Sequence, residues 1–79
     1  MSNKANKPLL WKFVKSSNIF KYGYDLKYRD LFIVFINRKN AVYRFEKVPY
    51  TIFLGLNDAI SKGDYFADKI KGRYDFIIE

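Results

Sequence analysis

The sequence predicts an α+β domain in which a small curled antiparallel β-sheet of three to five strands carries one amphipathic helix and a short second helix. The chain has 79 residues, which is enough for one domain with one core. Side chains alternate in character over 19–25, 41–46 and 73–78, which is typical of strands. After Pro49, apolar residues recur at 52, 53, 56, 59 and 60, which is the spacing of an amphipathic helix.

The first half of the chain supplies the arm and the central hairpin. Residues 1–13 are predicted to be a basic N-terminal arm, and residues 14–79 to be the single folded domain. A candidate first strand over 9–15 spans the boundary between the two. Serine and asparagine at 16–18 predict a turn before the strand 19–25. Gly23 in that strand indicates a bulge or a close backbone approach.

The unbroken apolar run LFIVFI at 31–36 predicts a central strand that is covered on both faces. A polar loop of hairpin length, 37–40, then leads into the partner strand. In that strand Tyr43 and Phe45 share one face, and Arg44 lies on the other.

Glycines and a proline delimit the predicted helices. Pro49 ends the partner strand, and the helix over 50–61 contains Gly55, which is expected to let it pack close to the sheet. Gly63 is the expected left-handed cap of this helix. A second helix over 64–71 is capped by Asp64 and turns Phe66 and Ile70 inward, and a last strand follows at 73–78.

Several short motifs occur in a fixed order along the chain. They are VKSSNI at 14–19, GYD at 23–25, an apolar strand at 31–35, VYRF at 42–45, VP at 48–49, AISKG at 59–63, Phe66 and IKGRY at 70–74. Their order and spacing resemble the KTSC domain, which occurs at the C-terminus of some lysyl-tRNA synthetases and as a small stand-alone protein of bacteria and phages. The resemblance covers about residues 14–76. It departs from the family pattern at the hairpin loop Arg38-Lys39-Asn40, where a glycine turn is common, and at Ala67, where an asparagine is expected.

The resemblance implies two kinds of function. The association with a tRNA enzyme implies RNA binding. A phage origin implies a small protein that binds a component of its host. Neither implication includes a catalytic role.

Positive charge is concentrated in the first half of the sequence. The net charge is +7, and residues 1–44 hold ten basic and two acidic side chains, a net of +8. Such a field attracts polyanions such as nucleic acid or an acidic protein surface. The alternative is a lysine-rich surface that only keeps a small apolar domain in solution.

Missing residue types exclude several classes of function. There is no cysteine and no histidine, which excludes disulfides, the usual zinc sites and the commonest nucleophiles and general bases. No glycine-rich phosphate loop is present, and no apolar stretch is long enough to span a membrane. We therefore expect a non-enzymatic protein without metal or cofactor, located in the cytoplasm, which is that of the bacterial host if the source is a phage.

The candidate binding residues are basic side chains interleaved with tyrosines, a composition typical of surfaces that bind single-stranded nucleic acid. They are Lys15, Lys21, Tyr22, Tyr24, Lys27, Tyr28, Arg29, Arg38, Lys39 and Arg44. The alternative for the tyrosine-rich segment is an ordinary hairpin loop with a tyrosine packed over it.

The strand AVYRFEKV permits two interpretations. Tyr43 and Phe45 either form a base-stacking platform or belong to the core, and the core is favoured because so small a domain needs that face for its helix. Arg44, with Lys21 or Lys15 as neighbours, is then the better contact. Trp11 is either a core anchor or an exposed binding aromatic.

Two functional hypotheses follow for this non-catalytic binding module. The first is binding of RNA or single-stranded nucleic acid through the basic first half. The alternative is a small phage or bacterial protein that binds and inhibits a host protein complex, such as a polymerase or a defence system. Salt dependence separates them, because contacts to phosphates weaken steeply between 50 and 200 mM salt.

Overall fold

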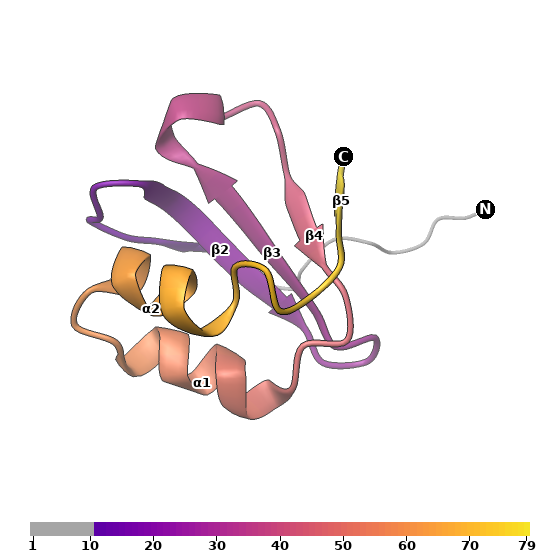
Figure 1. The fold of residues 1–79 in the computed structure, drawn as a ribbon. Coiled ribbons are helices and arrows are strands. Elements are labelled where there is room, and N and C mark those ends of the chain that lie inside the picture. The colour runs from indigo at the N-terminus through magenta and orange to yellow at the C-terminus, as the bar shows by residue number, and fades with distance from the viewer. Residues whose placement is uncertain (1–10) are drawn as a thin grey trace.

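The computed structural model describes residues 11–79, in which antiparallel strands form one five-stranded sheet and both helices lie on the same face of it (Figure 1). The strand order β1-β2-β3-β4-β5 follows the sequence. The elements are β1 (Lys12–Phe13), β2 (Ile19–Asp25), β3 (Asp30–Phe35), the 3-10 turn η1 (Ile36–Arg38), β4 (Tyr43–Phe45), α1 (Tyr50–Asp58), α2 (Lys62–Lys69) and β5 (Phe76–Ile78). The predicted α+β class is confirmed. Residues 1–10 of the predicted basic arm lie outside the described residues, and of the candidate strand at 9–15 the described part of the chain shows β1 at Lys12–Phe13.

The β2–β3 hairpin forms the centre of the sheet. Its ladder pairs Tyr22 with Ile33 and Tyr24 with Leu31, so these side chains share the face that the helices cover. The turn is closed by Asp25, whose carboxylate accepts the backbone N–H groups of two of the four loop residues that follow it. Such an Asx turn satisfies donors that the hairpin loop would otherwise leave unpaired.

The bulge in β2 lies at a different place from the one predicted. Pairing passes regularly through Gly23, which faces Phe32, and the register instead shifts between Ile19 and Lys21. Of the two alternatives predicted for Gly23, a bulge or a close backbone approach, the bulge was therefore wrong. An extra residue at the start of β2 re-aims the side chains beside it, which matters for the surface described below.

The outer face of β3 is also covered, as the apolar run predicted, but the last residue of that run, Ile36, is exposed in η1 and not part of the strand. Phe32 and Val34 point away from the helices and are nevertheless buried. The ring of Trp11 meets Phe32 edge to face at a centroid distance of 6.4 Å. A strand buried on both faces reads as a continuous apolar sequence, which explains LFIVF.

The first helix ends earlier than predicted. Ala59 is extended, with φ −66° and ψ 135°, and Ile60 is fully exposed, so neither belongs to the apolar face of α1. Lys62 instead closes the helix, because its ammonium donates to the carbonyls of Leu56, Asn57 and Ala59 at 3.0–3.1 Å. A lysine at this position can donate to the carbonyls at the C-terminal end of a helix, of which the Leu56 carbonyl also accepts the Ala59 N–H at 3.3 Å.

The second helix begins at Lys62 with Ser61 as its N-cap. The Ser61 hydroxyl accepts the backbone N–H of Asp64 at 3.2 Å, so the predicted cap at Asp64 was wrong. Gly63 lies within the first turn rather than in a left-handed cap. Gly72, with φ of 77°, is the glycine in the left-handed region.

Gly55 allows a close helix–helix contact, not the helix–sheet contact that the sequence predicted. A Cβ at this position would overlap the Tyr65 hydroxyl oxygen. The Tyr65 hydroxyl donates to the carbonyl of Ile52 at 3.0 Å, which fixes α2 across α1. Only a residue without a side chain leaves room for this bond.

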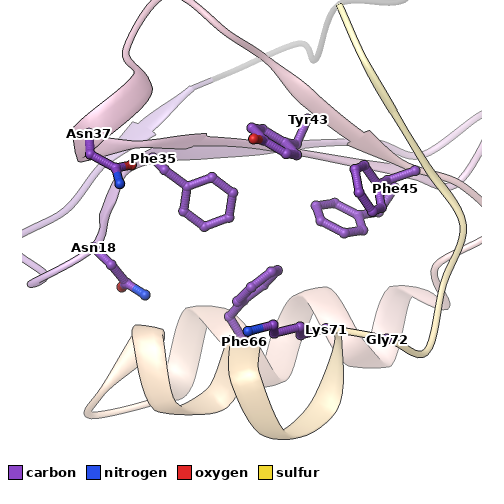
Figure 2. A pocket seen from close by; sticks show the side chains of 9 residues that line it. Asn18, Phe35, Asn37, Tyr43, Phe45, Phe66, Lys71 and Gly72 are labelled. Atoms are coloured by element: carbon purple, nitrogen blue, oxygen red, sulfur yellow. The ribbon is translucent and has the colours of Figure 1, made fainter.

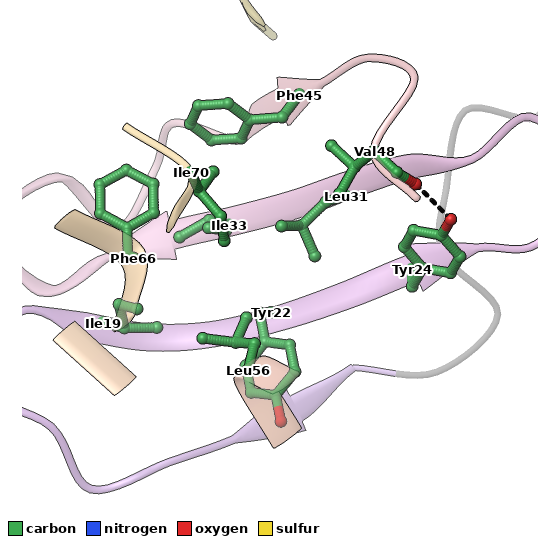
Figure 3. Packing of buried hydrophobic residues seen from close by; sticks show 10 residues of the cluster. All are labelled: Ile19, Tyr22, Tyr24, Leu31, Ile33, Phe45, Val48, Leu56, Phe66 and Ile70. Atoms are coloured by element: carbon green, nitrogen blue, oxygen red, sulfur yellow. Dashed lines mark hydrogen bonds between the residues drawn. The ribbon is translucent and has the colours of Figure 1, made fainter. Parts of the chain in front are cut away.

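The core lies between the helices and the sheet (Figure 3). Its buried members are Ile19, Tyr22, Tyr24, Leu31, Ile33, Phe45, Val48, Leu56, Phe66 and Ile70. The Tyr24 hydroxyl donates to the Val48 carbonyl, and the Tyr22 hydroxyl donates to the Asn57 side chain. Both buried hydroxyls therefore have partners, as buried polar groups require.

Candidate nucleic-acid interface

Cations and aromatic rings gather on the outer face of the sheet, near the β1 edge. We call this set the cation–aromatic cluster, and its members are Trp11, Phe13, Phe20, Lys21 and Lys39. The Lys21 ammonium lies 4.3 Å from the Trp11 ring centroid and 5.4 Å from that of Phe13. The Lys39 ammonium lies 4.5 Å from the Phe20 ring centroid. These distances are those of cation–π contacts.

The bulge in β2 assembles this cluster. Strict alternation would send Phe20 and Lys21 to opposite faces, but the register shift lets both lie beside Phe13. Phe13 is the ladder partner of Lys21, and its ring meets Phe20 edge to face at 5.4 Å. Phe13 is 65% exposed, so a ring face is accessible next to two cations.

The cations of the cluster are not neutralised by neighbouring acids. Within residues 11–79, the ion pairs join Arg44 to three carboxylates and Lys69 to Asp68. In this part of the chain the other predicted cations therefore have no carboxylate partner: Lys15, Lys21, Lys27, Arg29, Arg38 and Lys39. Their field remains available to an anionic ligand.

Two of the predicted binding tyrosines belong to the core. Tyr22 and Tyr24 are buried on the helix side of β2, so neither can stack on a base, and their selection as contacts is corrected. Burial raises the pKa of both hydroxyls. Alternation in the strand had placed them on one face, but it did not indicate which face the helices cover.

The remaining residues of the tyrosine-rich segment form a separate patch. Tyr28 is 52% exposed in the β2–β3 turn, and the Lys27 ammonium lies 5.3 Å from its ring centroid. Arg29 is exposed in the same turn with φ of 61°. This turn is at the far end of β2 from Lys21, about 13 Å along the strand at roughly 3.3 Å per residue. The predicted site is thus divided between the two ends of the sheet.

The η1 turn lies at the same end of the sheet as the cation–aromatic cluster. The Ile36 N–H donates to the Asn18 carbonyl at 2.8 Å, which holds η1 beside the β1–β2 turn. Arg38 points toward the helix side, where its guanidinium donates to the Tyr43 hydroxyl at 3.1 Å. Lys39 reaches Phe20 instead. Lys15 is exposed in the β1–β2 turn itself.

Arg44 is an internal ion-pair centre rather than a contact for a partner. Its guanidinium lies 2.8 Å from a Glu79 carboxylate oxygen, 3.0 Å from Glu46 and 3.4 Å from Asp30. Its side chain is only 16% exposed. Acids stand where Lys21 and Lys15 were predicted as neighbours, because β4 is flanked by β3, which carries Asp30, and by β5, which Glu79 directly follows. Hydrogen bonding to Glu79 raises the pKa of Arg44, whereas burial raises that of Asp30.

Sequence reasoning missed a pocket between α2 and the helix-covered face of the sheet (Figure 2). We call it the aromatic pocket; its volume is about 380 Å³. It is lined by Asn18, Phe35, Asn37, Tyr43, Phe45, Phe66, Lys71, Gly72 and Phe76. These residues come from six separate stretches of sequence, so local patterns gave no signal for it. The favoured assignment of Phe45 to the core agrees with its burial, whereas Tyr43 is half-buried at the pocket.

Among residues 11–79, no three acidic side chains are grouped so that they could hold a metal ion. The same residues contain no helix with the length and apolar character needed to span a membrane.

Comparison with known proteins identifies the family. A sequence comparison found no match among curated proteins. The crystal structure of a KTSC domain protein from Yersinia pestis is similar, with a TM-score of 0.79 and 34% sequence identity over 86% of this chain and 93% of that one. The family model described as the KTSC domain matches residues 15–74, nearly the whole span of the motifs found in the sequence. The chain therefore belongs to the KTSC domain family.

Proposed function

We propose that this KTSC domain is a non-catalytic module that binds RNA or single-stranded nucleic acid through its cation–aromatic cluster. The observation that carries the proposal is the position of Lys21, which lies over the rings of Trp11 and Phe13 without a carboxylate partner in residues 11–79. We place its action in the cytoplasm, in the bacterial host cell if the protein is phage-encoded.

The cluster combines the two contacts that single strands offer. A base can stack on the exposed ring of Phe13, and such stacking contributes about 1–3 kcal/mol per base. A lysine ammonium on a flexible stem can leave its ring and contact a phosphate as the base takes its place. Lys15 and Lys39 extend the positive field along the same end of the sheet.

A titration at several salt concentrations tests the proposal. A labelled single-stranded RNA is titrated with the protein from 50 to 200 mM salt, and binding is followed by fluorescence anisotropy. The Lys21→Gln/Lys39→Gln variant is expected to bind more weakly, and its log–log salt slope should be smaller by about 1.4, since each phosphate contact contributes about 0.7.

The matched control removes two charges elsewhere. Lys47 and Lys69 are exposed and lie outside the cluster, so Lys47→Gln/Lys69→Gln changes net charge equally. Equal losses of RNA affinity in the two double variants would show that only net charge matters, and would contradict a binding site at the cluster.

A second candidate function, docking on a host protein, is favoured by the β5 edge. Phe76, Ile77 and Ile78 are all apolar and about half exposed in the last strand of the sheet. Val42 and Glu79 exchange two backbone hydrogen bonds across β4 and β5, at 2.8 and 3.3 Å. Alternation of the ladder then turns the backbone groups of Phe76 and Ile78 outward, where a strand from another protein can pair with them.

Docking by strand addition predicts that partner binding depends on the backbone N–H of Ile78. Ile78→Pro removes one outward N–H and keeps the bonds to β4, whereas Ile78→Val keeps both. In a pull-down after nuclease treatment, a protein retained by Ile78→Val and lost by Ile78→Pro would favour strand addition. Retention by both variants would exclude the β5 edge.

A further inference from the structure

We propose that the aromatic pocket receives one unstacked nucleobase of the strand held at the cation–aromatic cluster, an inference that rests on the proposed function. The pocket lies on the helix side of the sheet, and the cluster lies on the outer face. The two are thus separate sites with separate contacts, joined at the end of the sheet where η1 lies.

Aromatic rings form the walls of the pocket. Phe35 meets Tyr43 at a centroid distance of 5.0 Å and Phe66 at 5.3 Å, and Phe45 meets Phe66 at 5.6 Å and Phe76 at 5.3 Å. Figure 2 shows Phe35, Tyr43, Phe45 and Phe66 around an open centre. Proteins that recognise single strands stack splayed-out bases on rings of this kind.

The rim of the pocket is polar and carries no negative charge. Its polar side chains are those of Asn18, Asn37 and Lys71, together with the Tyr43 hydroxyl, and no acidic residue is among the lining residues. Asparagine can donate to and accept from the edge of a base, most characteristically adenine. Lys71 adds a cation to the lining, and a lysine ammonium can contact a phosphate of the bound strand.

The two amides differ in how firmly they are held. The Asn18 Oδ1 accepts from the Ser16 hydroxyl at 3.1 Å, and a Cβ on Gly63 would lie 2.5 Å from the same oxygen. The side chain is thereby fixed between the β1–β2 turn and α2, with its Nδ2 left to donate. Asn37 is exposed and makes no side-chain hydrogen bond to the rest of residues 11–79, so both of its polar atoms are available.

Three consecutive residues connect the pocket to the cluster. Asn37 lines the pocket, Arg38 bonds the Tyr43 hydroxyl at its wall, and Lys39 lies over Phe20 on the outer face. Consecutive Cα atoms are about 3.8 Å apart, so the Cα atoms of Asn37 and Lys39 are at most about 7.6 Å from each other, and η1 is the segment along which one strand would pass between the two sites. An apolar side chain of a partner protein would contact the aromatic walls of the pocket but would not form hydrogen bonds with the asparagine amides at its rim, which favours a nucleobase as the ligand.

The pocket is tested first with ligands that lack phosphate. Adenosine, guanosine, cytidine and uridine are titrated at millimolar concentration into the isotope-labelled protein, with N-acetylphenylalaninamide as the comparison ligand. We expect a nucleoside to shift the ring resonances of Phe35, Tyr43, Phe66 and Phe76. Asn37→Ala should weaken this binding at least about fivefold, the lower end of what an asparagine–base pair contributes.

The control and the distinction from the proposed function come from the same chain. Asn40→Ala changes an exposed asparagine that does not line the pocket, and should bind nucleosides like the wild type. Trp11 is the sole tryptophan, so its fluorescence reports ligand at the cluster alone. The Lys21→Gln/Lys39→Gln variant should lose RNA binding but still show the nucleoside-induced shifts of the pocket resonances.

Three outcomes would overturn the assignment of the pocket. They are nucleoside shifts confined to the Trp11 side, equal responses of Asn37→Ala and Asn40→Ala, and binding of the phenylalanine derivative as tight as that of any nucleoside. In each case salt-dependent RNA binding at the cluster can still stand. Conversely, pocket shifts with nucleosides but no RNA binding would refute the proposed function and leave the pocket as a nucleobase site.

Discussion

Replacing Arg44 by methionine is predicted to destabilise the domain, and the geometry of the three ion pairs gives the size of the effect. One guanidinium is shared by Asp30, Glu46 and Glu79, and the side chains of Arg44 and Asp30 are only 16% and 11% exposed. Arg44→Met keeps the apolar stem and removes the charge. Three carboxylates are then left close together, one of them nearly buried.

The expected loss lies between two known limits. An exposed ion pair contributes about 0–1 kcal/mol, whereas removing one partner of a buried pair costs about 3–5 kcal/mol. Asp30 is buried but its contact with Arg44 is long, at 3.4 Å, and the other two acids are partly exposed. We expect a free energy of unfolding lower by about 2 kcal/mol at pH 7, which is a decrease of roughly 8–16 °C in Tm for a domain of this size.

The pH dependence identifies the cause. Burial raises the pKa of Asp30 in the folded state, and Arg44 counteracts this rise. A folded protein with a raised carboxyl pKa holds its proton longer than the unfolded chain, so stability falls as pH rises from the unfolded pKa through the folded one. Without Arg44 this pKa rises further. The difference in free energy of unfolding between the variant and the wild type should therefore be small at pH 3 and largest at pH 7.

Urea denaturation of the wild type and of Arg44→Met at pH 3, 5 and 7 measures this difference in free energy of unfolding. Asp30→Asn in the Arg44→Met background should restore much of the loss, because it removes the buried charge that the arginine had balanced. A difference that is the same at all three pH values would refute the electrostatic account, and would show that Arg44 acts only through packing of its stem.

Three further substitutions test the core and the helices by thermal denaturation. Gly55→Ala should destabilise despite the higher helix propensity of alanine, because the new Cβ would clash with Tyr65; a second change, Tyr65→Leu, should remove most of that loss. Tyr24→Phe should cost about 1–3 kcal/mol, since the buried carbonyl of Val48 loses its donor; an unchanged Tm would show that water replaces the hydroxyl. Ser61→Ala should cost about 1 kcal/mol through loss of the α2 cap, and an equal loss in Ser61→Thr would contradict that cause.

Much of the fold was predictable because periodicity and turn chemistry are local properties. The run at 31–36 predicted burial on both faces, and residues 31–34 of β3 have it, whereas Ile36 is exposed in η1. Helix ends were less predictable, since they depend on contacts between segments. Lys62 ends α1 by reaching three carbonyls, and Gly63 is required by the side chain of Asn18, 45 residues earlier in the chain. Neither requirement is visible in the neighbouring sequence.

The candidate site was predictable in composition but not in arrangement. Basic and aromatic residues do gather on one surface, but Tyr22 and Tyr24 belong to the core, and the rings beside Lys21 and Lys39 include Phe13 and Phe20. The bulge in β2 causes this arrangement, and no glycine or proline marks it. A one-residue shift of register re-aims side chains, so a single unmarked bulge is enough to misplace a predicted surface.

The charge asymmetry of the sequence becomes a spatial asymmetry through the topology of the sheet. Strands follow one another in order, so the first half of the chain builds one side of the sheet and the last strand closes the other. Arg44, the last cation of the basic half, sits at the boundary and is neutralised by Glu46 and Glu79 from the acidic half. The cations nearer the β1 edge have no such acids within reach among residues 11–79, and therefore retain their field. The order of the strands places the cation–aromatic cluster at the first strands and the apolar β5 edge at the last, and Phe76 belongs both to that edge and to the aromatic pocket. A nucleobase in the pocket and a protein strand on β5 would therefore compete, whereas nucleic acid held at the cluster alone would leave the β5 edge free.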